Sequence, residues 1–516
     1  MNIHSEKILI IDFGSQTTQL IARRIREQKV YCEIHPYYTD LAKIKELKPS
    51  GLILSGGPRS VYDKGAPTCA PGLFDLDLPI LGICYGAQLM VQEMGGVVEK
   101  ADKREFGKSV LDIISHDGLF AGLDRDKKEC QVWMSHGDSI DKLPDHFLAS
   151  AQSEHSPYAA IRHESRPLVG VQFHPEVVHT LIGTDILRNF LFNICKCHPT
   201  WTMGSFIDTT VAAIRQKVGS DQVICALSGG VDSAVTAALI HRAIGDQLTC
   251  IYVNNGLMRT NETASLLQFF ADTTHLKVID IDAVDYFLTE LEGVIDPELK
   301  RKKIGYGFIK IFEEEAKKLG DVKYLAQGTL YPDVIESIAL DGGTVIKSHH
   351  NVGGLPDIMQ LDLIEPLREL FKDEVRLVGL ELGLPDEAVF RQPFPGPGLG
   401  IRIMGEVDRL RLDILRQADV IVLEEMKTSG WYQKVWQSFA VLLPIQTVGV
   451  MGDERTYENV IALRCVDSLD AMTADWSKLP YELIGRISNR IINEVRGVNR
   501  VVFDVSSKPP STIEWE

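Results

Sequence analysis

The sequence predicts an α/β protein with two doubly wound parallel-sheet domains, followed by a smaller α+β domain at the carboxyl end. Three observations lead to this prediction. Short apolar runs that end in turn residues alternate with helix-forming stretches over the first 200 residues, and the same alternation begins again after residue 205. Beyond residue 391 this alternation stops, and strand-like runs flank a charged turn. Strands that alternate with helices are typical of parallel sheets.

Length and composition limit the class of protein. A chain of 516 residues is too long for one hydrophobic core, and about three domains are expected. We place their boundaries at residues 1–200, 201–390 and 391–516. Hydrophobic residues make up 45% of the chain, but no run of about 18 apolar residues or signal-peptide pattern is present. We therefore expect a cytoplasmic protein with no membrane partner.

The charge balance argues against nucleic acid as a partner. The chain has 54 basic and 71 acidic residues, a net charge of −17. Such a charge repels a phosphate backbone, although a local basic pocket can still hold a small anion. Nine scattered cysteines without a C-x-x-C pair indicate reduced thiols. The segment Cys195-Lys196-Cys197-His198 suggests a metal, but it lacks a second ligand pair at zinc spacing.

The first part of the chain alternates strands and helices. Apolar runs at Lys7–Asp12 and Gly51–Leu54 flank a helical stretch, Thr17–Glu27. A third apolar run, Leu78–Ile83, leads into a turn and a further helix that reaches Met94. This order predicts a parallel sheet.

The third run ends in a G-x-C-x-G pattern, Gly82-Ile83-Cys84-Tyr85-Gly86. At a strand-to-helix crossing this pattern predicts a nucleophile elbow in which sulfur replaces oxygen. The turn would expose the Cys84 thiol, and the start of the helix would favour the thiolate. The alternative is a buried core cysteine, since free cysteine behaves as a small hydrophobe.

A base for this cysteine follows the predicted strand Leu168–Phe173, at His174-Pro175-Glu176. A cysteine nucleophile needs an imidazole to take its proton, and the imidazole needs a third group to orient it. Glu176 can point the same way as His174. A lone His-Pro-Glu would be a surface turn, but with the elbow it predicts a triad of Cys84, His174 and Glu176.

Residues 7–195 resemble the class I glutamine amidotransferase domain, and Gly56-Gly57-Pro58 matches its oxyanion loop. The resemblance implies that the backbone N–H groups of Gly57 and Tyr85 stabilise a tetrahedral oxyanion. It also implies a thioester at Cys84, the release of ammonia, and an Asp138 carboxylate that faces the α-ammonium of glutamine. The implied glutamine-binding residues are Gln88, Ser135, His136 and Asp138.

The second part opens with a helix, Phe206–Val218, and an apolar run, Val223–Leu227, followed by Ser228-Gly229-Gly230-Val231-Asp232-Ser233. Adjacent glycines let backbone N–H groups approach an anion, and the helix that follows adds a partial positive charge. The alternative is a Gly-Gly turn capped by serine. The loop lacks the lysine of a P-loop and carries an acid, whose usual partner beside phosphate is a shared Mg²⁺.

The S-G-G-x-D-S motif resembles the pyrophosphate loop of the N-type ATP pyrophosphatases, which cleave ATP between its α- and β-phosphates and adenylate a substrate. The resemblance implies ATP as co-substrate and Mg²⁺ at Asp232. The family usually has Asp where this chain has Asn254, which weakens a metal role there and leaves a hydrogen-bonding role or a simple loop Asn. The implied ATP-binding residues are Ser228, Gly229, Gly230, Val231, Asp232, Ser233, Val253 and Lys372.

Further strands are predicted at Leu248–Val253 and Lys277–Ile281, which places the S-G-G-x-D-S loop and the Asn254 loop at the carboxyl ends of a doubly wound sheet, where ligands bind. The third part begins with a Pro/Gly-rich loop, Phe394–Arg402. Its predicted elements are a helix at Gln417–Thr428, strands at Ala440–Val450 and Tyr457–Val466, a helix at Pro480–Val495 and a strand at Arg500–Val505.

Four segments together make the whole chain resemble the glutamine-hydrolysing GMP synthetases: Ala326–Ser337, Lys347–Gly354, Glu365–Glu374 and the ending Lys508–Glu516. The resemblance implies that ATP adenylates the C2 oxygen of XMP and that ammonia then displaces AMP. It implies a lid near residues 350–365, a Lys372 that reaches toward ATP phosphates, and a C-terminal domain that forms a homodimer and binds nucleotide. The implied XMP-binding residues are Arg301, Lys508, Ile513 and Glu514.

Three alternatives share parts of this pattern. NAD synthetase or a similar amide-forming ligase would keep both sites, but the F-P-G-P-G-L-G and K-P-P-S-T-I-E-W-E segments argue against it. A nucleotide-binding sensor with an inactive amidotransferase fold is disfavoured by the intact cysteine, histidine and glutamate. An RNA-thiolating enzyme is disfavoured by the net charge and by the absence of a second paired cysteine.

Overall fold

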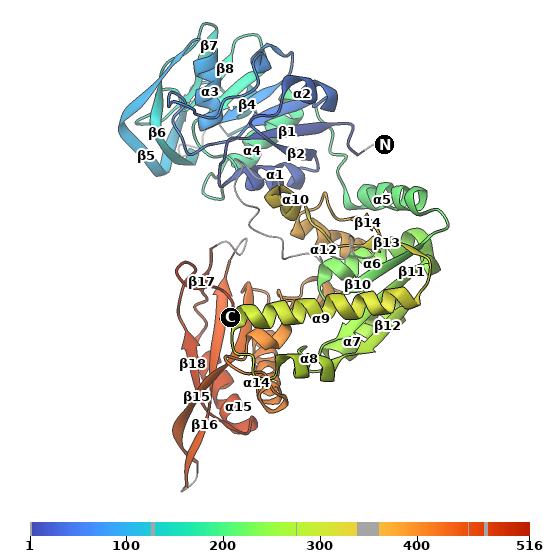
Figure 1. The fold of residues 1–516 in the computed structure, drawn as a ribbon. Helices are drawn as coiled ribbons and strands as arrows, with labels where there is room; N and C mark the ends of the chain where they lie inside the picture. Colours follow the sequence, from blue (N-terminus) through green and yellow to red (C-terminus); the bar gives the residue numbers. More distant parts are fainter. Residues whose placement is uncertain (1–2, 125–129, 275, 338–360, 452–453, 469–472) are drawn as a thin grey trace. The chain divides into compact units, whose positions relative to one another are not determined.

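The computed structural model describes residues 3–124, 130–274, 276–337, 361–451, 454–468 and 473–516. The described chain forms two compact units (Figure 1). The first comprises the described part of Met1–Thr209 and Pro332–Ile346, and the second that of Thr210–Tyr331 and Lys347–Glu516. No helix in these described ranges is long and apolar enough to cross a membrane.

A mixed sheet forms the centre of the first unit. Its strand order is β2-β1-β3-β4-β9-β8-β7-β5-β6. The pairs from β2 to β9 are parallel, and those from β9 to β6 are antiparallel. The strands are β1 (Lys7–Asp12), β2 (Tyr31–Pro36), β3 (Gly51–Leu54), β4 (Ile80–Ile83), β5 (Val97–Ile113), β6 (Cys130–Lys142), β7 (Phe147–Gln152), β8 (Ala160–His163) and β9 (Leu168–Val171). The helices are α1 (Thr18–Glu27), α2 (Leu41–Leu47), α3 (Tyr85–Glu93) and α4 (Gly183–Arg188).

Burial explains the two halves of this sheet. Every residue of β3, β4 and β9 is buried, as expected for parallel strands covered on both faces. Strand β6 alternates between buried and more exposed residues over most of its length, as expected for an antiparallel strand with one face toward solvent. The α/β class predicted from the sequence is confirmed, and the antiparallel half is an addition to it.

The second unit begins with a fully parallel sheet of order β12-β11-β10-β13-β14. The chain runs outward from β10 on one side and returns to β13 on the other, which creates a switch point at the carboxyl end of β10. The strands are β10 (Gln222–Leu227), β11 (Leu248–Asn254), β12 (Val278–Asp282), β13 (Val322–Ala326) and β14 (Asp362–Ile364). The helices are α5 (Met203–Val218), α6 (Val231–Ile244), α7 (Glu262–Phe269), α8 (Val284–Leu291), α9 (Pro297–Lys318), α10 (Tyr331–Ser337), α12 (Lys372–Glu381) and α13 (Asp386–Val389), of which α5 begins and α10 mostly lies in the first unit.

The end of the chain adds an antiparallel sheet to the second unit. Strands β15 (Gln437–Met451), β16 (Glu454–Asp467), β17 (Asp475–Trp476) and β18 (Val498–Asp504) form this sheet, with helices α14 (Arg409–Thr428) and α15 (Tyr481–Glu494) beside it (Figure 1). One hydrophobic core runs from Ile224 and Leu325 of the parallel sheet through Leu399 to Leu463 and Ile487. The parallel sheet and the terminal sheet are therefore packed as one body, within which the boundary expected near residue 390 stays a prediction.

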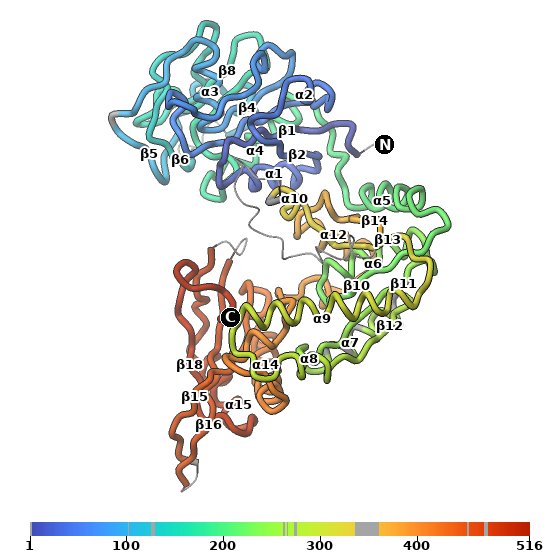
Figure 2. The backbone as a smooth tube through the Cα atoms, in the orientation of Figure 1, coloured from blue at the N-terminus to red at the C-terminus, as the bar shows by residue number. Residues whose placement is uncertain are grey.

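The carboxyl terminus is folded against this body. Figure 2 shows the end of the chain beside the first turns of α9. There, the fully buried Lys300 ammonium donates to a Glu516 side-chain oxygen at 2.5 Å and to the Ile403 carbonyl at 2.7 Å. Because a buried ammonium needs several acceptors, this contact holds the last residue in place.

Candidate active sites

The turn around Cys84 has the geometry of a nucleophile elbow. Cys84 joins β4 to α3 with φ 52° and ψ −107°, a backbone conformation that residues other than glycine rarely adopt. A Cβ atom at Gly82 would lie 2.6 Å from Ala87 Cα, and one at Gly86 would lie 2.4 Å from the Leu54 carbonyl oxygen. Both glycines of the motif are therefore required by close backbone approach. The exposed Cys84 thiol expected from the sequence is wrong, because Cys84 is 6% exposed and its turn is covered by the packed segments around it.

The structure brings His174 and Glu176 to this sulfur. His174 Nδ1 lies 2.7 Å from Glu176 Oε1, and Glu176 is completely buried. Burial by itself lowers the pKa of His174, but the Glu176 carboxylate and a hydrogen bond with the Cys84 thiol outweigh it and raise the pKa of His174 to about 10. The environment thus favours an imidazolium beside the Cys84 thiol, which is the arrangement that can activate a cysteine.

Two threonines that no motif indicated hold the triad. Thr17 Oγ1 donates to Glu176 Oε1 at 2.6 Å. Thr180 Oγ1 donates to the His174 carbonyl at 2.6 Å and accepts the Trp133 N–H at 3.0 Å. Thr17 is 159 residues away from Glu176 in the chain, so spacing carries no signal for this contact.

The predicted oxyanion loop lies against the triad. A Cβ atom at Gly56 would meet His174 Cε1 at 3.2 Å, and one at Gly57 would meet the Tyr85 ring at 3.1 Å. Tyr85 is the first residue of α3, so its N–H has no partner within the helix. The Tyr85 N–H thus follows Cys84 directly, and Gly57, the other expected donor, packs against the Tyr85 side chain.

The residues expected to bind glutamine gather along β6 and α3. Asp138 accepts hydrogen bonds from Ser60 Oγ at 2.5 Å and Tyr62 OH at 2.7 Å, which orient its carboxylate. Gln88 uses its amide nitrogen twice, toward the Asp138 carbonyl at 3.1 Å and Gln172 Oε1 at 3.0 Å. Both amide hydrogens of Gln88 are therefore committed, and its carbonyl oxygen is the group that can face a ligand.

Ser135 and His136 have different surroundings. The Ser135 carbonyl accepts from Cys84 Sγ at 3.8 Å, so the strand backbone lies against the nucleophile. His136 is buried, with Nδ1 2.8 Å from the Asp138 carbonyl and Nε2 3.3 Å from the Glu105 carboxylate. The buried His136 side chain thus contacts the β6 backbone at Asp138 and the Glu105 carboxylate of β5.

The S-G-G-x-D-S loop connects β10 to α6 at the switch point. Gly229 has φ 80°, in the region that glycine tolerates, and α6 begins directly after Gly230. The hydroxyl oxygens of Ser228 and Ser233 lie 3.1 Å apart, and Ser233 Oγ donates to the Gly230 carbonyl at 3.0 Å. The loop therefore presents two hydroxyls and a helix start toward solvent, as an anion site requires.

Lys372 and Asp232 meet beside this loop. Lys372 is the first residue of α12, and its ammonium hydrogen-bonds Asp232 Oδ2. Asp232 Oδ1 is buried and has no hydrogen-bond partner within the described ranges. Val253 is buried near the end of β11, and Asn254 Oδ1 accepts the Gly256 N–H at 3.1 Å, which closes a local turn.

A further arginine that the motifs did not indicate touches the loop. Arg391 donates to the Gly229 carbonyl at 2.8 Å, and burial together with the neighbouring Arg259 lowers the pKa of Arg391 to about 10. The guanidinium groups of Arg259, Arg391 and Arg402 lie 4.8, 5.5 and 5.0 Å from the centre of the Phe394 ring. Phe394 of the Pro/Gly-rich loop thus contacts Arg391, which bonds the S-G-G-x-D-S loop, and also Arg402, which lies toward the C-terminal sheet.

One of the C-terminal residues expected to bind XMP, Glu514, is linked to Phe394 through Arg402. The fully buried Arg402 holds both oxygens of Glu514, at 3.0 and 2.8 Å, and Gln437 Nε2 donates to the same carboxylate at 2.8 Å. Ile513 packs on the cluster of Phe439, Val441 and Ala462. Glu514 is therefore fixed in place by the core of the unit.

The other two residues expected to bind XMP are Arg301, whose side chain contacts the tail, and Lys508, which lies in the tail. Arg301 on α9 hydrogen-bonds the Glu516 carbonyl, and Lys508 pairs through its backbone with Ala474 at 3.0 and 2.7 Å. The predicted segment Lys347–Gly354 and most of the predicted lid, residues 350–365, lie outside the described residues.

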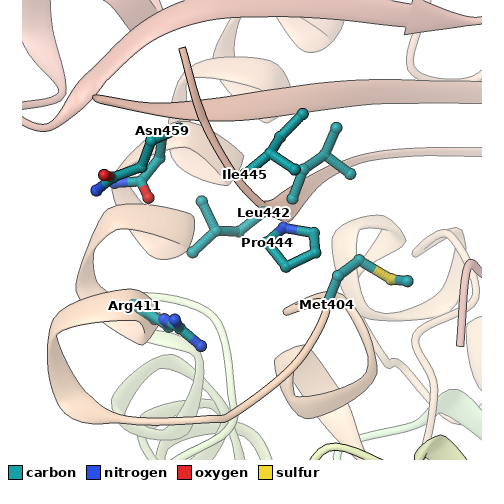
Figure 3. A pocket seen from close by; sticks show the side chains of 8 residues that line it. Met404, Arg411, Leu442, Pro444, Ile445 and Asn459 are labelled. Carbon is teal, nitrogen blue, oxygen red and sulfur yellow. The ribbon is translucent and has the colours of Figure 1, made fainter. Parts of the chain in front are cut away.

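A cavity of about 320 Å³ lies in the C-terminal part of the second unit (Figure 3). It is lined by Met404, Arg411, Leu442, Leu443, Pro444, Ile445, Gln446 and Asn459. None of these belongs to the predicted sites. Over the described ranges, no group of three or more His, Cys, Asp and Glu side chains lies close enough to hold a metal ion.

Known proteins match this chain over its whole length. Three family models match: glutamine amidotransferase class-I over residues 9–194, NAD synthase over residues 205–300, and GMP synthase C terminal domain over residues 424–515. The GMP synthase [glutamine-hydrolyzing] of Desulfotalea psychrophila is 70% identical, covering 100% of both chains. Those of Brachyspira hyodysenteriae and Carboxydothermus hydrogenoformans are each 57% identical, covering 100% and 99% of this chain and 100% of the relative.

Proposed function

This chain belongs to the glutamine-hydrolysing GMP synthases, and from that premise we propose how its residues divide the reaction between two sites. The enzyme is an ATP-dependent ligase that converts XMP to GMP with nitrogen from glutamine. The observation that carries the proposal is the presence of a cysteine, histidine and glutamate site in one unit and a phosphate-binding loop with its lysine in the other.

We assign glutamine hydrolysis to Cys84, His174 and Glu176. The thiolate of Cys84 attacks the side-chain carbonyl carbon of glutamine, and the N–H groups of Gly57 and Tyr85 stabilise the oxyanion that forms. The His174 imidazolium, held by Glu176, gives its proton to the departing nitrogen, so that ammonia leaves and a thioester remains. A water molecule that gives its proton to His174 then cleaves the thioester to glutamate.

The glutamine itself is held by side chains around this centre. Asp138, oriented by two hydroxyls, suits the α-ammonium group. The Gln88 carbonyl oxygen can accept from the substrate, because its nitrogen is already committed. Ser135 and His136 shape the strand that faces the substrate.

We assign adenylation to the second unit. Residues 228–233, Val253 and Lys372 hold ATP, with the helix start and the lysine charge directed at the phosphates. The C2 oxygen of XMP attacks the α-phosphorus and pyrophosphate leaves. Ammonia then adds at C2 and AMP leaves, which yields GMP. The residues proposed for XMP are Arg301, Lys508, Ile513 and Glu514.

Mg²⁺ fits the surroundings of Asp232. The buried Oδ1 of this carboxylate lacks a hydrogen-bond partner within the described part of the chain, which a cation would supply. Mg²⁺ usually takes one or two carboxylates together with substrate phosphates and water, so one carboxylate suffices beside a nucleotide. When bound, the ion would supply positive charge against the negative charge on the leaving pyrophosphate. Asp232 would hold it, while Lys372 keeps the other oxygen of Asp232 in place.

We also propose a homodimer formed through the C-terminal sheet. Apolar side chains are exposed along it, among them Val450 at 76%, Tyr457 at 59% and Ile445 at 52%. Covering such a face with a second copy removes it from water, and an apolar exposed sheet face is typical of an interface.

We further propose a cytoplasmic location. All nine cysteines are free thiols, which agrees with a reducing compartment.

The two-site proposal is tested by Cys84→Ala. This substitution removes the nucleophile, so GMP formation from glutamine should be lost, while formation from added ammonium salts should remain at the wild-type rate. Cys69→Ala, in the same unit, is the matched control and should keep both activities. Loss of both activities in Cys84→Ala, or retention of both, would overturn the proposal.

A further inference from the structure

A buried glutamine that no motif assigned touches the reacting sulfur. Gln172 follows β9, is 1% exposed, and has its N–H bonded to the Ala159 carbonyl at 2.8 Å. Its Nε2 lies 3.6 Å from Cys84 Sγ, and its Oε1 accepts from Gln88 Nε2 at 3.0 Å. The side chain thus lies between the nucleophile and a residue proposed to bind glutamine.

The surrounding contacts determine which end of the Gln172 amide faces the sulfur. The carbonyl of Asp138 can only accept, so the group of Gln88 that lies 3.1 Å from it must be the amide nitrogen. That same nitrogen faces Gln172, which must present its oxygen there. The NH₂ group of Gln172 therefore points at Cys84 Sγ, an orientation that follows from the network of partners.

Besides His174, the sulfur has two neighbours of opposite hydrogen-bonding character. The Ser135 carbonyl, at 3.8 Å, is an acceptor and suits a thiol, whereas the Gln172 amide is a donor and suits a thiolate. The ionisable group that faces Sγ is His174, backed by Glu176. A donor to a charged acceptor forms a stronger bond than one to a neutral acceptor, so the Gln172 contact gains strength when the thiol ionises.

We propose that Gln172 is a catalytic residue of the glutaminase site, whose amide donates to Cys84 sulfur and stabilises the thiolate, with Gln88 setting its orientation. The inference rests on the proposed role of Cys84. It links the proposed glutamine-binding residue to the nucleophile through one side chain, because movement of the Gln88 amide changes the donor that holds the Gln172 oxygen in place.

The test compares Gln172→Met with Gln88→Met in the full-length enzyme. Both remove the bond between the two glutamines, but Gln172→Met alone removes the donor to sulfur. The rate at which iodoacetamide alkylates Cys84 is measured against pH by mass spectrometry of its peptide. We expect Gln172→Met to raise the pH midpoint of Cys84 alkylation by about one unit, which corresponds to about tenfold less thiolate at pH values below the midpoint. The substitution should also lower kcat for glutamine. Gln88→Met should mainly raise KM.

The control is Gln152→Met, the same substitution at an exposed glutamine of the same unit, which should leave the alkylation profile unchanged. Gln172→Leu repeats the test if Gln172→Met does not fold, as judged by ammonia-driven synthesis and thermal unfolding. An alkylation midpoint equal to that of the wild type, or equal shifts in Gln172→Met and Gln88→Met, would refute the role of Gln172. Glutamine-driven turnover in Cys84→Ala would instead refute the proposed function.

Discussion

The hydrogen bond from Thr17 to Glu176 should be required for glutamine hydrolysis. Glu176 is completely buried, and its Oε1 accepts from Thr17 Oγ1 at 2.6 Å and lies 2.7 Å from His174 Nδ1. Its other oxygen is buried and has no hydrogen-bond partner in the described part of the chain. The carboxylate therefore depends on two side-chain donors, and Thr17→Val removes one of them with little change in volume.

The size of the effect follows from this burial. A hydrogen bond to a charged group contributes about 1.5–3 kcal/mol, and water cannot replace the lost donor at a site with no solvent exposure. We expect the free energy of unfolding of the first unit to fall by about 2 kcal/mol. Because Glu176 orients His174, the glutaminase rate should fall by about tenfold or more.

The assay measures glutamate release, ammonia-driven GMP formation and thermal unfolding of Thr17→Val beside Thr17→Ser. The serine variant keeps the hydroxyl and should retain most of the activity. Ammonia-driven synthesis should be unchanged in both, since the second unit carries it. A Thr17→Val enzyme with full glutaminase activity and unchanged unfolding would refute the reasoning.

Two further predictions follow from charged groups in the two sites. Because the folded protein raises the pKa of His174 from its ordinary 6.5 to about 10, the stability that protonated His174 contributes is fully present below pH 6.5 and is lost as pH rises toward 10. The fall in unfolding free energy between these pH values should be smaller in His174→Gln, as measured by urea denaturation, and an identical fall in both proteins would contradict the assignment. Asp232→Ala should abolish GMP formation from either nitrogen source, because the carboxylate that positions Lys372 and would hold Mg²⁺ is gone. Asp246→Ala, in the same unit, is the control, and ammonia-driven synthesis retained by Asp232→Ala would rule out this role.

Local sequence patterns predicted the elements that carry the chemistry. The strand expected at Leu168–Phe173 is β9 (Leu168–Val171), and the helix expected at Phe206–Val218 is α5 (Met203–Val218). One helix was expected to begin at Gln417 but begins eight residues earlier, where the Asp408 side chain accepts the Arg411 N–H and caps it. Between residues 409 and 416, charged residues alternate with apolar ones, so the apolar face of the helix is not evident from the number of hydrophobic residues.

The two turns that we propose as catalytic could be found from sequence because glycine is required where backbone segments approach closely. Gly82 and Gly86 leave no room for a Cβ atom, and Gly229 adopts a positive φ. These requirements for glycine fall within five or six consecutive residues, so they can be recognised in the sequence as a motif. The likeness of the last nine residues to a known ending was readable in the same way.

Contacts between distant segments could be seen only in the folded chain. Thr17 reaches Glu176 across 159 residues, Gln172 reaches Cys84 across 88, and Arg391 reaches Gly229 across 162. The antiparallel half of the first sheet likewise depends on pairing among β5 to β9. The sequence alone thus predicted the fold class, which the structure confirms, and the motifs around Cys84 and residues 228–233 for which we propose catalytic and phosphate-binding roles, because the constraints on these motifs are local. Only the tertiary structure decided which buried donors support them, because packing of distant strands and helices sets those contacts.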